Sequence, residues 1–113
     1  MSQNHNEISV SATELETLGD EIIILDVRKP AARSGSGLAI PGARWRHPFD
    51  AANWAGEFKG MRVAAYCVHG HEVSQAVRGY LADTGIEAVL LEGGFEAWKQ
   101  SGLPVEPVAD TDA

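Results

Sequence analysis

Two apolar segments, residues 22–27 and 62–67, constrain the fold more than any other feature of the sequence. Neither shows the apolar–polar alternation of a strand with one wet face, so each is expected to be a strand buried on both sides. Between the second segment and the next apolar run, residues 74–84 carry apolar side chains at helical spacing. Buried strands that alternate with helices are typical of a parallel sheet covered on both faces, so we predict an α/β fold.

The remaining elements are shorter. Strands are expected at residues 8–10, 44–47 and 88–91, and helices at 11–18, 53–58 and 95–101. Ser11 and Glu14 have the spacing of a capping box at the start of the first helix. Residues 30–37 are expected to form a loop because they are rich in Gly, Ser and Pro.

The length of 113 residues suits one domain. We expect a disordered leader at residues 1–6, the domain at 7–105 and a flexible tail at 106–113. The single cysteine excludes an internal disulfide, which favours a reducing compartment. The N-terminal residues lack the apolar core of a signal peptide, and no run reaches the length of a membrane span. A cytoplasmic location is therefore expected.

The net charge of −7 disfavours nucleic acid and anionic membranes as partners. The charge is unevenly distributed, because no acidic residue lies between Asp26 and Asp50. Five of the nine basic residues fall in that stretch: Arg28, Lys29, Arg33, Arg44 and Arg46. The stretch is either a solvated basic face or a wall that attracts anions to an otherwise acidic protein.

Cys67 is the candidate nucleophile. It ends a predicted strand, and the sequence after it leads through Gly70 into a helix. A thiol reacts as its thiolate, which the free N–H groups of such a loop and the positive end of a helix dipole stabilise. His69 and His71 add charge when protonated, and Ser74 is placed to cap the helix or to donate to an oxyanion. The alternative is a buried, inert cysteine, since free cysteines are often buried.

No metal site is expected. Cys67, His69 and His71 contain ligand atoms for zinc, but their spacing fits none of the usual zinc patterns. The sequence holds no second cluster that would complete a tetrahedral site.

Four segments in order resemble the signatures of the rhodanese (thiosulfate sulfurtransferase) superfamily. They are Ile24-Leu25-Asp26-Val27-Arg28, Ile40-Pro41-Gly42-Ala43, Tyr66-Cys67-Val68-His69-Gly70 and Glu92-Gly93-Gly94-Phe95-Glu96-Ala97-Trp98. The resemblance extends from about residue 8 to 105 and implies a single-domain rhodanese-like fold with a five-stranded parallel sheet. It also implies that Gly94 and Trp98 are structural, packing the last helix on the sheet.

The resemblance further implies a reaction that uses no organic cofactor or metal. Cys67 would accept a sulfane sulfur from thiosulfate or a related small anionic donor and pass it to cyanide or a cellular thiol, with a protein sulfur-relay partner as a further option. The implied substrate loop consists of Val68, His69, Gly70, His71, Glu72, Val73 and Ser74. Asp26 and Arg28 would support it from the neighbouring strand end.

The basic stretch suggests how an anionic donor reaches the site. Loops after parallel strands emerge at the same edge of the sheet. Some of Arg28, Arg44 and Arg46 are therefore expected near the mouth of the Cys67 site. Arg28 has an alternative role as a structural ion pair with Asp26 or Glu92.

Three departures from the family pattern leave other functions open. Glu72 stands where many members carry a cation, and Leu38-Ala39 stand where the family turn often has Gly-His. Ser74 follows Cys67 by seven residues rather than six, as in relatives that bind phosphate or arsenate. Those relatives need an arginine where this chain has Val73. The alternatives are an enzyme for a larger oxyanion (arsenate, chromate or a phosphoester) and a non-catalytic rhodanese module that binds a partner or senses a signal.

Overall fold

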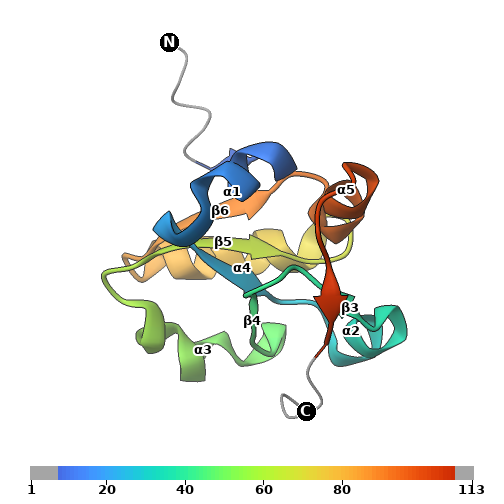
Figure 1. Cartoon of the computed structure of the whole chain (residues 1–113). Helices are drawn as coiled ribbons and strands as arrows, with labels where there is room; N and C mark the ends of the chain where they lie inside the picture. Colours follow the sequence, from blue (N-terminus) through green and yellow to red (C-terminus); the bar gives the residue numbers. More distant parts are fainter. Residues whose placement is uncertain (1–7, 109–113) are drawn as a thin grey trace.

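The computed structural model describes residues 8–108 of the chain, whose centre is a five-stranded parallel sheet (Figure 1). The strand order is β1-β6-β5-β2-β4. The strands are β1 (Ser9–Val10), β2 (Ile23–Asp26), β4 (Arg44–Trp45), β5 (Arg62–Tyr66) and β6 (Glu87–Leu91). All four neighbouring pairs are parallel, which confirms the predicted sheet. The two apolar segments of the sequence pair directly, with Leu25 beside Ala65.

Within residues 8–108, five α-helices and three short 3-10 turns connect the strands. The helices are α1 (Ala12–Leu18), α2 (Pro30–Ser36), α3 (Ala51–Trp54), α4 (Glu72–Asp83) and α5 (Gly94–Gln100). The 3-10 turns are η2 (Gly19–Glu21), η3 (Pro48–Asp50) and η4 (Ala55–Phe58). The capping box at the start of α1 is confirmed, since Glu14 N–H donates to Ser11 Oγ at 3.1 Å and Ser11 N–H to Glu14 Oε1 at 2.8 Å.

The side chains of β5 divide the core between the two faces of the sheet. Ala64 and Tyr66 pack with residues of α1 and α5 on one face. Val63 and Ala65 pack with residues of α3, η4 and α4 on the other face. Successive strand residues point to opposite faces, so a strand covered by helices on both sides carries mostly apolar side chains. The expectation of helices on both faces is confirmed (Figure 1).

The prediction of a loop at residues 30–37 is wrong, because the chain forms α2 there. Pro30 occupies the first turn, where its missing N–H costs nothing, and Gly37 ends the helix in the left-handed conformation with φ of 72°. This order of proline at the start and glycine at the end is a helix signal. The Gly and Ser content between them concealed it.

A second, two-stranded antiparallel sheet joins the C-terminal part of the chain to the loop after α2. It pairs β3 (Leu38–Ala39) with β7 (Glu106–Pro107), which lie side by side in Figure 1. Val108 N–H also donates to the Gly37 carbonyl at 3.0 Å. The pairing therefore continues beyond residue 105, where the sequence predicts a flexible tail. The predicted leader at residues 1–6 and the tail beyond residue 108 lie outside the described residues.

Within residues 8–108, none of the helices has both the length and the apolar character needed to cross a membrane.

Candidate active site

Cys67 directly follows β5 at the carboxyl edge of the sheet. The loop of residues 68–71 separates it from α4, which begins at Glu72. The residue is 7% exposed, so it is largely buried but reaches the wall of a pocket. A sulfur placed just before a helix N-terminus lies where partial positive charge favours an anion.

Ser74 contacts the sulfur of Cys67. The two side chains form a hydrogen bond with Sγ and Oγ 3.1 Å apart, and Ser74 is fully buried. Its predicted role as N-cap is wrong, because His71 precedes the helix and Ser74 is the third helical residue. The hydroxyl is thus free to face the thiol, and once the thiol loses its proton the hydroxyl can donate to the sulfur.

The loop after Cys67 is anchored by the first turn of α5. Phe95 N–H donates to the carbonyl of Cys67 at 2.9 Å, and Glu96 N–H donates to the carbonyl of Val68 at 3.0 Å. No described peptide bond is cis, and in a trans peptide the N–H points away from the carbonyl. The N–H groups of Val68 and His69 therefore point away from α5.

Gly70 and Gly94 allow this close approach. Gly70 has φ of 78°, and a Cβ there would lie 3.1 Å from the backbone nitrogens of Gly93 and Gly94. A Cβ on Gly94 would lie 2.5 Å from the Cys67 carbonyl oxygen and 2.6 Å from the Gly70 nitrogen. The resemblance implies only a packing role for Gly94, whereas the structure places it against the cysteine loop.

The Cys67 pocket has a volume of about 420 Å³. Its lining residues are Arg28, Lys29, Ala32, Cys67, Val68, His69, His71, Glu72 and Val73. The structure thus brings most of the predicted loop residues together with Arg28, while Gly70 and Ser74 do not line the pocket. Lys29 and Ala32 are both missing from the predicted site. Lys29 is the N-cap of α2, and Ala32 lies in α2, where a loop was predicted.

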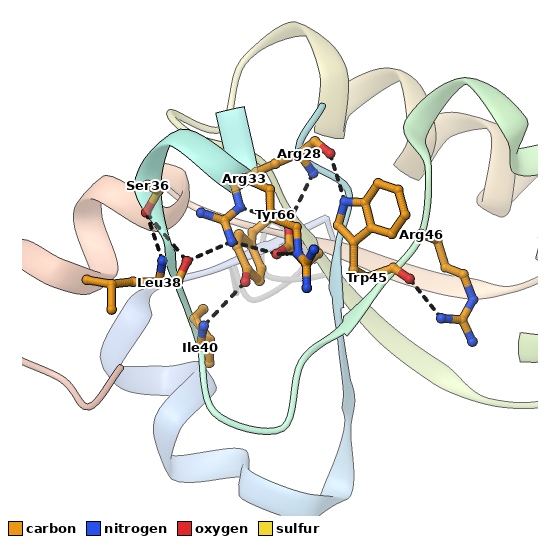
Figure 2. Close-up of polar contacts among 9 residues, drawn as sticks. Arg28, Arg33, Ser36, Leu38, Ile40, Trp45, Arg46 and Tyr66 are labelled. Carbon is orange, nitrogen blue, oxygen red and sulfur yellow. Dashed lines mark hydrogen bonds and ion pairs between the residues drawn. The ribbon is translucent and has the colours of Figure 1, made fainter. Parts of the chain in front are cut away.

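Arg28 forms the structural ion pair that was one of its two predicted roles (Figure 2). Its Nε and Nη2 donate to the two carboxylate oxygens of Asp26 at 2.9 and 2.7 Å, and Nη2 also donates to the Leu38 carbonyl at 2.9 Å. Burial by itself lowers the pKa of Arg28, but the hydrogen bonds and charge of Asp26 outweigh it, so the net pKa is raised. Arg28 is 1% exposed, and its role in this ion pair is structural.

Tyr66 belongs to the core beside this ion pair. Its ring stacks on Phe95 with centroids 5.8 Å apart, and its hydroxyl accepts the N–H of Ile40 at 3.3 Å. Burial, followed by the nearby charge of Asp26, raises the pKa of Tyr66 well above its ordinary value. The residue directly before Cys67 is therefore a neutral phenol wherever the protein is folded near neutral pH.

Arg44 and Arg46 do not line the Cys67 pocket. Arg44 lines a separate pocket between α1 and α5, and Arg46 pairs with Glu57 at 2.6 Å. Lys29 is the exposed basic residue of the Cys67 pocket. The basic stretch is visible in the sequence. Which of its residues faces the cysteine is not, because that depends on the direction in which α2 leaves the sheet.

No group of three or more His, Cys, Asp or Glu side chains in the described part of the chain is arranged to hold a metal ion. His69 and His71 have ring centroids 6.3 Å apart, and both are exposed.

Fold and site together define a class: a parallel α/β domain that presents one cysteine in the loop before a helix. A model of the rhodanese-like domain matches residues 11–101, and the chain belongs to that family. The rhodanese-related protein of Thermoplasma volcanium superposes with a TM-score of 0.79 at 25% identity, covering 88% of this chain and 97% of that one.

Two curated relatives match part of their own length. An uncharacterized protein of Synechocystis, slr1261, is 28% identical over 110 residues, which is 91% of this chain and 58% of the relative. The thiosulfate sulfurtransferase GlpE of Vibrio cholerae is 44% identical over 45 residues, which is 39% of this chain and 42% of GlpE. The chain thus spans about half the length of these relatives.

Proposed function

We propose that the protein is a sulfurtransferase that carries a sulfane sulfur as a persulfide on Cys67. The observation that carries this proposal is the placement of the Cys67 sulfur in the wall of a pocket, 3.1 Å from the Ser74 hydroxyl and just before the N-terminus of α4. Family membership and the partial match to a thiosulfate sulfurtransferase support it.

The proposed reaction has two displacement steps at sulfur. The Cys67 thiolate attacks the outer sulfur of the donor; with thiosulfate, the new S–S bond forms as the old one breaks, and sulfite leaves with the bonding electron pair. A thiolate or cyanide then attacks the outer sulfur of the persulfide, and the Cys67 thiolate leaves. Each intermediate is an anion, which the helix N-terminus and the loop N–H groups stabilise.

The alternative of a larger oxyanion as substrate has less support. Val73, which stands where oxyanion-handling relatives need an arginine, lines the Cys67 pocket. The pocket also carries Glu72, whose negative charge opposes any multiply charged anion, thiosulfate included. The exposed Lys29 places one positive charge on the same wall. A single positive charge suits a singly charged donor or an organic persulfide.

Mass spectrometry of the intact protein tests the proposal. Wild type and Cys67→Ser are incubated separately with thiosulfate and with an organic persulfide. We expect one added sulfur on the wild type and none on Cys67→Ser, with release of that sulfur on addition of a thiol or cyanide. No added sulfur from either donor, or equal addition to the variant, contradicts the proposal and favours a non-catalytic module.

A further inference from the structure

A second pocket of about 490 Å³ lies beside the Cys67 pocket, and we call it the apolar groove. Its lining residues are Lys29, Pro48, Phe49, Ala51, Ala52, Glu72, Val73, Ala76, Val77 and Tyr80. Eight of the ten are apolar or aromatic. They come from η3, α3 and α4, so the groove lies on the face of the sheet that α3 and α4 cover.

The apolar groove adjoins the Cys67 pocket. Lys29, Glu72 and Val73 line both. Two of these shared residues are charged, Lys29 positively and Glu72 negatively. A ligand that reacts at Cys67 has room to extend past them onto the apolar walls of the groove.

Small inorganic donors and acceptors leave this groove unexplained. Thiosulfate, sulfite and cyanide are ions with no hydrocarbon to bury. Yet Phe49 is 71% exposed and Tyr80 is 39% exposed in the groove, although both rings belong to types that favour burial. The Phe49 ring lies 5.7 Å from the His47 ring and 5.8 Å from Lys29 Nζ, and the backbone N–H of Phe49 donates to His47 Nδ1 at 3.2 Å. An organized apolar wall of this kind fits a ligand with an apolar part.

We propose that the apolar groove binds the hydrocarbon part of an organic thiol or persulfide whose sulfur reacts at Cys67. This inference rests on the proposed function and names its substrate class. The volume suits a small molecule, since ligand pockets commonly measure about 300–1,000 Å³. A protein partner fits less well, because a stable interface buries about 800 Å² on each side. Phe49 and Tyr80 are the exposed large apolar side chains of the groove within the described residues.

A labelling series tests the groove without relying on sulfur transfer. Cys67 is the one cysteine of the sequence, so N-alkylmaleimides report on it alone. Rate constants are measured by intact mass for the methyl, ethyl, butyl and hexyl reagents, with a cysteine-containing peptide as reference. Burial of the added methylene groups is expected to raise the hexyl-to-methyl ratio of Cys67 about tenfold above that of the peptide.

Two variants alter the groove. Phe49→Ala removes its aromatic wall, and Ala76→Gln brings a polar side chain into it from an exposed position on α4. Both are expected to lower the hexyl-to-methyl ratio about threefold or more. The matched control is Met61→Ala, which shortens another exposed apolar residue that lies outside both pockets and should leave the ratio unchanged.

The same variants are then tested as sulfurtransferases with alkyl thiols of equal acidity as acceptors. Faster transfer to the longer thiols in wild type, lost in Phe49→Ala, supports the proposed substrate class. Equal ratios in wild type, variants and peptide overturn it, whether or not sulfur is transferred. A chain-length effect in labelling without any persulfide formation contradicts the proposed function but supports apolar binding in the groove.

Discussion

Gly94 and Cys67, which lie 27 positions apart in the sequence, meet so closely that a Cβ on Gly94 would be 2.5 Å from the Cys67 carbonyl oxygen. The N-terminus of α5 donates hydrogen bonds to the same carbonyl and to that of Val68. The last helix therefore holds the cysteine loop in place. This contact explains why a glycine pair far from the cysteine belongs to the site.

Replacing Gly94 with alanine is expected to destabilise the protein and to abolish sulfur transfer, because the cysteine loop must move to make room. Gly102→Ala is the matched control, since Gly102 has a similar φ of 76° but no heavy atom within 4 Å of its added Cβ. Both variants carry a backbone strain of about 1 kcal/mol. Urea unfolding and persulfide formation should show the larger loss for Gly94→Ala; equal losses would mean that the close contact contributes nothing.

Gly70→Ala is expected to impair sulfur transfer more than stability. The left-handed backbone disfavours alanine, and the added Cβ would press on the backbone of Leu91, Gly93 and Gly94 at 3.1–3.2 Å. Shifts of a few tenths of an ångström relieve this contact but move the loop N–H groups. The rate of persulfide formation should fall more than tenfold for a stability loss of about 1–2 kcal/mol. Full activity would show that the loop backbone does not cradle the sulfur.

Ser74→Ala is expected to slow alkylation of Cys67 by iodoacetamide about tenfold near neutral pH. The hydroxyl 3.1 Å from the sulfur donates to the thiolate, and a hydrogen bond to a charged group is worth about 1.5–3 kcal/mol. Ser101→Ala is the control, since the Ser101 hydroxyl bonds the Ala97 carbonyl instead. A Ser74→Ala protein that is folded and alkylated as fast as wild type would assign Ser74 to packing alone.

Arg28→Met is expected to lower the free energy of unfolding by about 3–5 kcal/mol, because it leaves the buried Asp26 carboxylate without its main partner. Adding Asp26→Asn should restore part of the loss, since the uncompensated charge disappears. The control is Arg62→Met, which breaks the more exposed pair with Glu87 and should cost less than about 1 kcal/mol. Similar losses for Arg28→Met and Arg62→Met in urea titrations would argue against a structural ion pair.

Because Tyr66 is buried, the protein is expected to lose stability in alkaline solution. Its pKa is raised in the folded protein, whereas an unfolded chain has the ordinary value of about 10. Its contribution is thus fully present below about pH 10 and falls above it, because only the unfolded state releases the proton. The slope is about 1.4 kcal/mol per pH unit. Tyr66→Phe should lack this component when unfolding free energies are compared between about pH 9 and pH 11; identical pH dependence would contradict a buried neutral phenol.

A parallel sheet covered on both faces was predictable from the sequence, because burial on both sides of a strand requires mostly apolar residues along it. Residues 22–27 and 62–67 are mostly apolar, with Asp26 and Arg62 as exceptions, since helices cover both faces of their strands. The position of Cys67 between a buried strand and a helix follows from the same pattern, and so does its place at the carboxyl edge. Such features are local and depend on the order of side chains along one element.

Tertiary structure alone decided which of those elements meet. The contact of Gly94 with the Cys67 loop, the pairing of β3 with β7 and the place of Lys29 rather than Arg46 in the pocket wall all join residues far apart in the chain. The wall that the apolar groove shares with the cysteine pocket also depends on such contacts. The spacing of apolar side chains along an element indicates which of its faces are buried. Which side chains share a cavity depends instead on the direction of each connection and on the packing of helix ends.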